Sequence, residues 1–265
     1  MKKALVTGGT SGIGAKIAEE LVKAGFDVTV TGRDPQKGEE AASALGARFV
    51  AVDHTDLDAV RALADRVGAV DVLVNNVGGA FWKRSTTDGG LERTLALNLA
   101  APVVLTEALL PSMSRGARIV NVVTKLERKM HLDLEDPQGE RRYGGFDAYA
   151  GAKVALLAWT RDLAARLEEA GIVVAAVHPG IVLGTSFGAD MPWLMRAIGP
   201  VAARLFGMAR SLDDAARTPV WLATADDAVS KHGAYLDLDR ELPLPDQVKD
   251  PAQVRRILDL CASFA

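Results

Sequence analysis

Cysteine and histidine are scarce in this 265-residue sequence, which contains one cysteine, Cys261, and four histidines. A single cysteine excludes a disulfide within the chain, and the histidines lack the spacing of metal ligands. The sequence therefore indicates neither a disulfide framework nor a metal site. Because chains without disulfides are typical of reducing compartments, we expect a cytoplasmic location.

A strong net charge and long apolar runs are also missing. The net charge of -3 and the isoelectric point near 5.9 indicate no basic surface for nucleic acid. The longest apolar stretches are interrupted by Asn98, Glu107 or His178 before they reach the ~18 residues of a membrane-spanning helix. The first apolar run starts close to Met1, so we expect no signal peptide. We therefore expect neither nucleic acid nor a membrane as a partner.

Short apolar runs do occur, and they alternate with stretches of helical periodicity. Six span residues 4–7, 28–31, 48–52, 72–74, 119–123 and 172–177, and a seventh is expected near 234–238. This order is typical of a parallel sheet covered on both faces. A composition of 49% hydrophobic and 25% charged residues suits one buried core, and no repeat or linker divides the chain. The sequence predicts one α/β domain over residues 1–265, with a doubly wound parallel sheet of seven strands and helices on both faces.

A glycine-rich turn follows the first apolar run and reads Thr7-Gly8-Gly9-Thr10-Ser11-Gly12-Ile13-Gly14. A helical stretch and a second apolar run come next, so the turn lies in a strand-helix-strand unit. In such a unit the glycines let the backbone approach the pyrophosphate of a dinucleotide, and the helix N-terminus directs its free N–H groups toward the phosphates. The spacing Gly-x-x-x-Gly-x-Gly is not the common dinucleotide one, so this segment alone is equally compatible with a turn that holds no ligand.

Tyr149 is the one tyrosine of the three that has a lysine four residues later, Lys153. Residues at this spacing share a face of a helix. A nearby ammonium favours the phenolate, so Lys153 is predicted to lower the pKa of Tyr149 from its ordinary ~10 toward the range of efficient proton transfer at neutral pH. The pair predicts a general acid and base, although such pairs are common by chance.

Taken in order, these motifs resemble those of the short-chain dehydrogenase/reductase family over nearly the whole chain. The other matching segments are Asp53, Asn75-Asn76-Val77-Gly78, Asn98, 118–124 and Pro179-Gly180. The resemblance implies a Rossmann fold, a nicotinamide dinucleotide, no metal, and hydride transfer between the nicotinamide and a ketone or alcohol. By this resemblance the cofactor-binding residues are Gly8, Thr10, Ser11, Gly12, Ile13, Gly14, Arg33, Asp53, His54, Asn75, Asn76, Val77, Gly78, Tyr149, Lys153, Pro179, Gly180 and Val182.

The choice of nucleotide is indicated by Thr31-Gly32-Arg33-Asp34, which follows the second strand. NAD-binding folds usually place a carboxylate here for the ribose 2′-hydroxyl, whereas a 2′-phosphate requires a cation. The guanidinium of Arg33 can form charge-assisted bonds to phosphate, so the sequence favours NADP(H) over NAD(H). The alternative is a solvated Arg33 paired with Asp34.

The family resemblance also implies catalytic roles. Tyr149 would exchange a proton with the substrate oxygen, Lys153 would hold the nicotinamide ribose, and Asn98 would hold a water that links Lys153 to solvent. Thr124 stands where the family commonly has the catalytic serine, and it keeps the hydroxyl that would orient the substrate oxygen. The alternatives are that Thr124 is only a strand-end residue and that Asn98 only satisfies a backbone group.

Two further segments bear on the substrate. The 24 residues 125–148 and the proline-containing tail resemble the retinol-dehydrogenase-like branch of the family. Residues 185–210 are an apolar lid candidate or an ordinary buried helix, and Thr185 lies one position later than the family's nicotinamide contact. If the lid exists, the substrate is bulky and apolar, such as a polyketide-like or lipid carbonyl.

The function expected from these features is NADPH-dependent carbonyl reduction or alcohol oxidation. The alternative is a non-catalytic NADP-binding sensor or interaction protein with the same fold, because a fold alone does not establish an activity. The family resemblance implies a homodimer or homotetramer.

Overall fold

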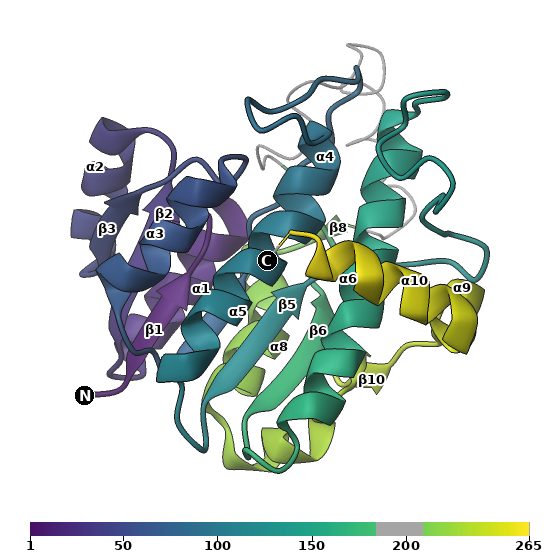
Figure 1. Cartoon of the computed structure of the whole chain (residues 1–265). Coiled ribbons are helices and arrows are strands. Elements are labelled where there is room, and N and C mark those ends of the chain that lie inside the picture. Colours follow the sequence, from purple (N-terminus) through teal and green to yellow (C-terminus); the bar gives the residue numbers. More distant parts are fainter. Residues whose placement is uncertain (184–208, 265) are drawn as a thin grey trace.

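The computed structural model describes residues 1–183 and 209–264, and its centre is a mostly parallel sheet (Figure 1). The strand order across the sheet is β10-β9-β6-β5-β4-β1-β2-β3. The strands are β1 (Lys3–Val6), β2 (Asp27–Gly32), β3 (Arg48–Ala51), β4 (Val72–Asn75), β5 (Arg118–Val122), β6 (Val173–His178), β9 (Tyr235–Asp237) and β10 (Arg240–Glu241).

The sheet contains eight strands where the sequence predicts seven. The seven expected strands are present and parallel, and β10 adds to the edge in antiparallel orientation beside β9. Its two residues, Arg240 and Glu241, are charged and exposed, so they lack the apolar run that identifies a buried strand. Leu238, in the turn before β10, has the left-handed φ of 56°. A separate short pair joins β7 (Ile181–Val182) to β8 (Ala209–Arg210).

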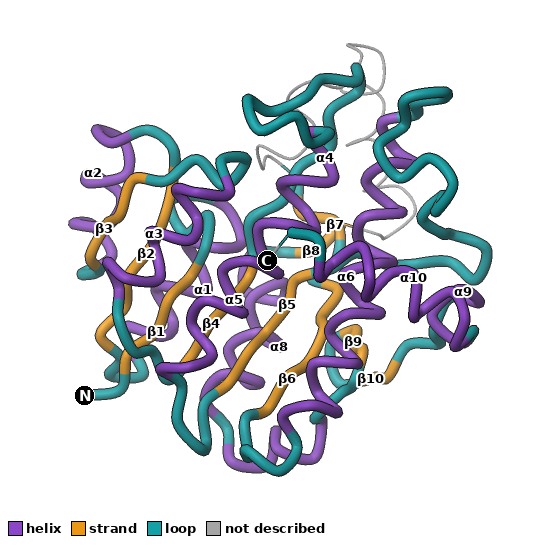
Figure 2. The backbone as a smooth tube through the Cα atoms, viewed as in Figure 1, coloured by secondary structure: helices purple, strands orange, loops and turns teal. Residues whose placement is uncertain are grey.

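Helices cover both faces of the sheet, as Figure 2 shows. Alternate residues of each buried strand point to opposite faces, so Leu5, Leu73 and Ile119 belong to one core and Val6, Val74 and Val120 to the other. The first core includes residues of α3 (Leu57–Val67), α5 (Ala101–Leu109), α6 (Gly145–Leu167) and α10 (Pro251–Ala262), and the second includes residues of α1 (Gly12–Lys23), α2 (Pro35–Leu45) and α8 (Leu212–Thr224).

The helical segment Arg93–Ser112 is long and apolar enough to cross a membrane, but 72% of its apolar window is buried inside this domain. It consists of α4 (Arg93–Leu95), the π-helical turn η1 (Ala96–Ala100), α5 and η2 (Leu110–Ser112). The sequence expectation of shorter apolar stretches was wrong here, because Asn98 and Glu107 lie within the helix without interrupting it. The segment is a core helix that packs against α3 and α6 on one face of the sheet. The remaining elements are η3 (Asp226–Lys231) and α9 (Asp246–Lys249).

Candidate active site

The glycine turn lies where β1 ends and α1 begins, at the carboxyl edge of the sheet. Its glycines are required by close packing. A Cβ on Gly14 would lie 2.3 Å from the carbonyl oxygen of Gly8, and one on Gly9 would lie 2.6 Å from Cγ1 of Val30 in β2. Gly8 also has a left-handed φ of 63°. Together these contacts hold the turn flat against the ends of the strands.

The segment after β4 is bonded directly to this turn. The hydroxyl of Thr7 accepts hydrogen bonds from the backbone N–H groups of Asn76 and Val77, both at 3.0 Å. Asn76 Nδ2 donates to the carbonyl oxygen of Thr7 at 2.9 Å. Asn75 instead points into the core and donates to Asn121 Oδ1 at 2.8 Å, so its side chain supports the sheet. Of the predicted residues 75–78, Asn76 and Val77 therefore bond to the glycine turn, whereas the side chain of Asn75 lies in the core.

His54 supports the glycine turn from inside the protein. Its Nε2 lies 2.8 Å from the hydroxyl of Thr31, and that hydroxyl accepts the N–H of Gly8 at 3.2 Å. Burial lowers the pKa of His54 to about 4, so the ring is neutral at pH 7. The family resemblance assigns His54 to the cofactor. The structure places its ring beneath the strand ends, with Thr31 between it and the turn, and the sequence carries no signal for this contact.

The end of β2 has no room for a larger side chain at Gly32. A Cβ there would lie 2.9 Å from the side chain of Thr10. Arg33 is exposed, and among the described residues it forms no ion pair; Asp34 instead caps α2 and lies 3.8 Å from Lys37 Nζ. The alternative of an Arg33–Asp34 pair is therefore not observed.

Asp53 is bound to its own loop. Its carboxylate accepts hydrogen bonds from the backbone N–H and the hydroxyl of Thr55, at 2.9 and 2.8 Å. Burial raises the pKa of Asp53, but these hydrogen bonds and the charge of Arg33 outweigh it and hold the pKa below its usual value. Asp53 and Arg33 therefore lie close enough for their charges to interact.

Tyr149 and Lys153 lie on one face of α6, but the expected effect on the tyrosine pKa was wrong. Burial raises the pKa of Tyr149, whose side chain is 8% exposed, and a hydrogen bond from the Thr124 side chain only partly opposes this. Lys153 is 3% exposed, and burial lowers its own pKa to about 7. Its Nζ donates to the carbonyl oxygen of Val122 at 2.9 Å and lies 6.0 Å from the centre of the Tyr149 ring. Desolvation is the main cause of both shifts, and Lys153 is not among the causes of the Tyr149 shift.

The side chain of Thr124 lies beside that of Tyr149. It is half-buried just beyond β5, and its hydroxyl contacts the phenol of Tyr149. Two hydroxyl groups therefore lie together, and their roles as proton donor and orienting group stay predictions.

Asn98 lies in the π-helical turn of the core helix, where its amide is bonded to backbone. Nδ2 donates to the carbonyl oxygens of Gly79 and Thr94 at 2.7 and 2.8 Å, and Oδ1 accepts the N–H of Gly79 at 3.2 Å. A Cβ on Gly78 would lie 3.0 Å from Asn98 Oδ1 and 3.4 Å from Lys153 Nζ. Asn98 thus satisfies backbone groups, as in the alternative reading of the sequence, and it also lies beside Lys153. Its water-holding role stays a prediction.

Pro179 and Gly180 follow β6 at the same edge of the sheet. Gly180 has a φ of 89°, and a Cβ there would meet the side chain of Arg210 at 2.2 Å. Arg210 pairs with Asp237 at 2.6 Å, which fixes β8 beside the end of β6. Burial lowers the pKa of His178 to about 4, consistent with a packing role. Of the lid candidate 185–210, residues 185–208, which include Thr185, lie outside the described residues, and residues 209–210 form β8.

Two residues of the loop after β4 were missed by the sequence analysis. Phe81 and Trp82 pack on the start of α6, where a Cβ on Gly145 would lie 2.6 Å from the carbonyl oxygen of Phe81. Tyr143 Oη donates to the same carbonyl oxygen at 2.7 Å. Residues 125–148, which we call the charged segment, therefore contact this loop where α6 begins.

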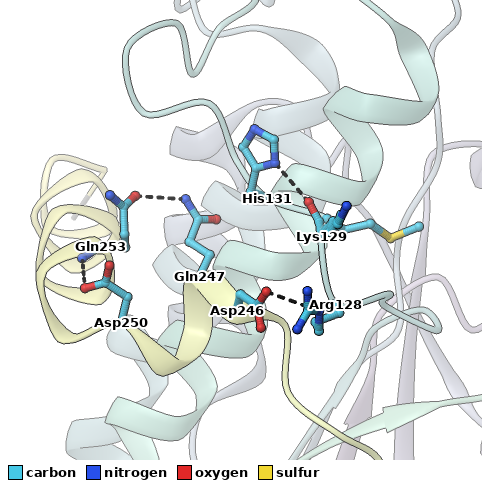
Figure 3. A pocket seen from close by; sticks show the side chains of 8 residues that line it. Arg128, Lys129, His131, Asp246, Gln247, Asp250 and Gln253 are labelled. Atoms are coloured by element: carbon cyan, nitrogen blue, oxygen red, sulfur yellow. Dashed lines mark hydrogen bonds and ion pairs between the residues drawn. The ribbon is translucent and has the colours of Figure 1, made fainter.

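A surface cavity of about 400 Å³ lies away from these residues, between the charged segment and the C-terminal helices (Figure 3). Its lining residues are Arg128, Lys129, Met130, His131, Asp246, Gln247, Asp250 and Gln253. Their polar groups bond within the protein: Arg128 pairs with Asp246 at 3.4 Å, and the Gln247 amide bonds the N–H and carbonyl of Leu132 at 2.8 and 2.9 Å. These contacts join the tail to the charged segment.

Comparison with known proteins agrees with this geometry. The family model described as short chain dehydrogenase matches residues 2–192. The chain belongs to the short-chain dehydrogenase family, and it is an oxidoreductase that acts on CH–OH or C=O groups.

The similar proteins also confirm the expected branch. The chain is 29% identical to human (Homo sapiens) retinol dehydrogenase 13 over 275 residues, which covers 97% of this chain and 82% of that protein. It is 30% identical to polyprenol dehydrogenase of Mus musculus, with 96% and 81% covered. A solved blue fluorescent protein from a metagenomic library, in complex with NADPH, is 33% identical with a TM-score of 0.69, and covers 89% of this chain and 96% of its own.

Proposed function

We propose that this protein is an NADPH-dependent carbonyl reductase or alcohol dehydrogenase for a bulky, apolar substrate. The observation that carries the proposal is the contact between the hydroxyls of Thr124 and Tyr149 beside the buried Lys153. All three residues lie at the carboxyl edge of the sheet, where open α/β folds bind their ligands. The glycine turn lies at the same edge.

The residues at this edge fit a dinucleotide. The N-terminus of α1 begins at Gly12 without a side-chain cap from Ser11, whereas side chains cap α2, α3 and α10. Its free N–H groups and positive dipole end therefore suit a phosphate. The glycine turn would hold the pyrophosphate and Lys153 the nicotinamide ribose. When bound, the nicotinamide would supply or accept the hydride.

The protein's own residues would manage the proton. The raised pKa of Tyr149 keeps the phenol protonated at neutral pH, so in carbonyl reduction it can donate its proton to the substrate oxygen. The Thr124 hydroxyl would orient that oxygen by a second hydrogen bond. Lys153, with its pKa lowered to about 7, could exchange a proton near neutrality.

A preference for NADPH is supported by the end of β2. Thr10 occupies the space that a side chain at position 32 would need, so Gly32 cannot be replaced by the carboxylate that favours NAD without displacing Thr10. Arg33 is exposed beside Asp53 and is available for a 2′-phosphate. Its availability accords with the NADPH found in the similar blue fluorescent protein.

An apolar substrate is supported by two exposed side chains near the site. Phe146 is 53% exposed and stands three residues before Tyr149 on α6. Ile181 is 44% exposed and follows Gly180. Exposed apolar side chains at a site favour an apolar ligand. The similar proteins named for retinol and polyprenol suggest the same class, a long or cyclic apolar alcohol or its carbonyl.

The test follows NADPH absorbance with a panel of apolar ketones and aldehydes, and NADP⁺ reduction with the matching alcohols. We expect turnover with at least one substrate, and a loss of about two to four orders of magnitude in Tyr149→Phe with nucleotide affinity unchanged. Tight NADPH binding without turnover of any substrate would instead support the alternative of a non-catalytic sensor.

Nucleotide choice is tested separately by calorimetric titration with NADPH and NADH. We expect tighter binding of NADPH and a smaller difference in Arg33→Ala, because that variant loses the cation for the 2′-phosphate. Lys37→Ala, which removes a neighbouring exposed cation paired with Asp34, is the matched control. Equal affinities of the parent protein for both nucleotides would overturn the preference.

A cytoplasmic homodimer or homotetramer is also part of the proposal, and light scattering on the purified protein tests the assembly.

A further inference from the structure

The chain just beyond β5 is held by a residue from a distant part of the sequence. Val123 N donates to Val177 O at 2.9 Å and so extends the pairing of β5 with β6 by one residue. The next groups, Thr124 O and Leu126 N, bond instead to the hydroxyl of Tyr235 at 2.7 and 2.9 Å. Leu126 is buried, so its N–H cannot reach water and depends on the Tyr235 hydroxyl for a hydrogen bond.

The Tyr235 hydroxyl satisfies both of these backbone groups with a single oxygen atom. Tyr235 Oη donates to Thr124 O and accepts from Leu126 N, and a hydroxyl has one proton to give and lone pairs to receive. Burial raises the pKa of Tyr235 to about 12, so the proton is retained at all ordinary pH values. Phenylalanine at this position would fill the space but make neither bond.

The register of the sheet explains how Tyr235 reaches this point. β9 is separated from β5 by β6, and Tyr235, Ala176 and Asn121 lie in one row across the three strands. Side chains in such a row share a face of the sheet. Because Ala176 carries only a methyl group, the phenol of Tyr235 can pass over β6 toward the end of β5. Tyr235 is 2% exposed there.

We propose that Tyr235 is a positioning residue for the reaction, which holds the main chain of Thr124 so that the Thr124 hydroxyl remains on Tyr149 and the substrate oxygen. The inference rests on the proposed carbonyl reduction. In this proposal Tyr235 is not itself a catalytic residue. It acts through the two peptide groups on either side of Lys125, and the first of them follows directly on Thr124, whose side chain is proposed to touch the reacting atoms.

The first arm of the test does not depend on activity. Hydrogen–deuterium exchange of the intact protein, parent and Tyr235→Phe, is compared for the peptide that contains residues 123–126. We expect exchange in this peptide to become at least about tenfold faster in Tyr235→Phe, because one buried donor and one buried acceptor lose their partner. Tyr143→Phe, which loses a tyrosine hydroxyl bonded to Phe81 O elsewhere, should leave this peptide unchanged. Unchanged exchange in Tyr235→Phe would overturn the proposal even if no substrate were found.

The second arm is a double-mutant cycle in kcat with Thr124→Val, Tyr235→Phe and the double variant. Tyr235→Phe alone should lower kcat about five- to tenfold, as expected when the hydrogen bond of the Thr124 hydroxyl is displaced. The NADPH dissociation constant should stay unchanged. In the Thr124→Val background the same change should have no further effect, because the hydroxyl that Tyr235 positions is already absent. Equal losses in both backgrounds would assign Tyr235 a structural role only. Failure of the parent to turn over any carbonyl would overturn the proposed function and leave the exchange result standing.

Discussion

The ring of His54 lies 2.8 Å from the hydroxyl of Thr31, and the same hydroxyl accepts the N–H of Gly8 at 3.2 Å. The threonine can donate to the neutral imidazole while it accepts from the glycine turn. A buried side chain after β3 is thereby connected, through β2, to the loop that would hold the pyrophosphate. We therefore expect the conformation of the glycine turn to depend on the contact between Thr31 and His54.

Thr31→Val is expected to weaken NADPH binding about five- to tenfold, because it leaves the Gly8 N–H and the His54 ring without their common partner. Calorimetric titration measures the change. Thr29→Val is the matched control: Thr29 is a buried threonine of the same strand, and its hydroxyl forms no hydrogen bond to the glycine turn within the described residues. If both variants bind NADPH as the parent does, the Thr31–His54 contact does not support the turn.

Thr124→Val should be severely impaired and Thr124→Ser active, if the hydroxyl contacts the reacting oxygen. Valine keeps the shape of the side chain but removes the hydrogen bond, and the expected loss of transition-state stabilisation is ~2.7 to 4 kcal/mol, by analogy with deleted oxyanion-hole donors. Steady-state kinetics of the two variants resolves this difference. Parental activity in Thr124→Val would mean that Thr124 is only a strand-end residue.

The sequence predicts the positions of the candidate site residues better than their pKa values. Tyr149 and Lys153 are identified by a helical spacing, and the glycine turn by its place between a strand and a helix, so local patterns suffice. The pKa of Tyr149 could not be predicted, because spacing reports that a lysine is near but not that both groups are buried. Desolvation depends on the packing of the entire layer around α6.

Contacts between residues on different strands also could not be predicted from the sequence. Tyr235 and Thr124 are 111 residues apart, and their contact depends on the register of β9, β6 and β5. The eighth strand was missed for a different reason, since a charged edge strand has no apolar face to bury. Strand positions can therefore be predicted from apolar runs, whereas partners across strands require the folded structure.

The buried Lys153 should make stability depend on pH in the nucleotide-free protein. Burial lowers its pKa from 10.5 to about 7, whereas the unfolded chain keeps the ordinary value. Between these values the unfolded chain binds a proton that the folded chain does not, so the free energy of unfolding rises with pH. Below about pH 7 both states are protonated, and the penalty for burying the charge is then greatest.

In Lys153→Met the free energy of unfolding should therefore rise less with pH than in the parent. The difference between the two rises is expected to be about a few kcal/mol between about pH 7 and 9. Urea denaturation of parent and variant at several pH values gives the two slopes. The measurements stay below about pH 10, because the raised pKa of Tyr149 lowers stability as the unfolded tyrosine ionises above that value. Parallel slopes in parent and variant would show that Lys153 is not buried as a neutral amine.

The C-terminal tail should stabilise the catalytic helix through Gln247. Its amide bonds both the N–H and the carbonyl of Leu132, and the backbone at Leu132 packs against Gly151, where a Cβ would lie 3.0 Å from His131 O. Gly151 stands between Tyr149 and Lys153, so only a residue without a side chain lets the charged segment approach α6 this closely.

Gln247→Leu is expected to lower the free energy of unfolding by about 1–3 kcal/mol, because two buried backbone groups of Leu132 lose their partners while the volume of the side chain is nearly kept. Urea denaturation measures the loss. Gln253→Leu is the matched control, since in the described part of the chain the Gln253 side chain bonds only to Gln247, at 3.3 Å. A similar loss in both variants would place the stabilisation in the Gln247–Gln253 contact. A loss confined to Gln247→Leu, together with faster hydrogen exchange in the peptide that contains residues 149–153, would show that the tail holds the charged segment against the catalytic helix.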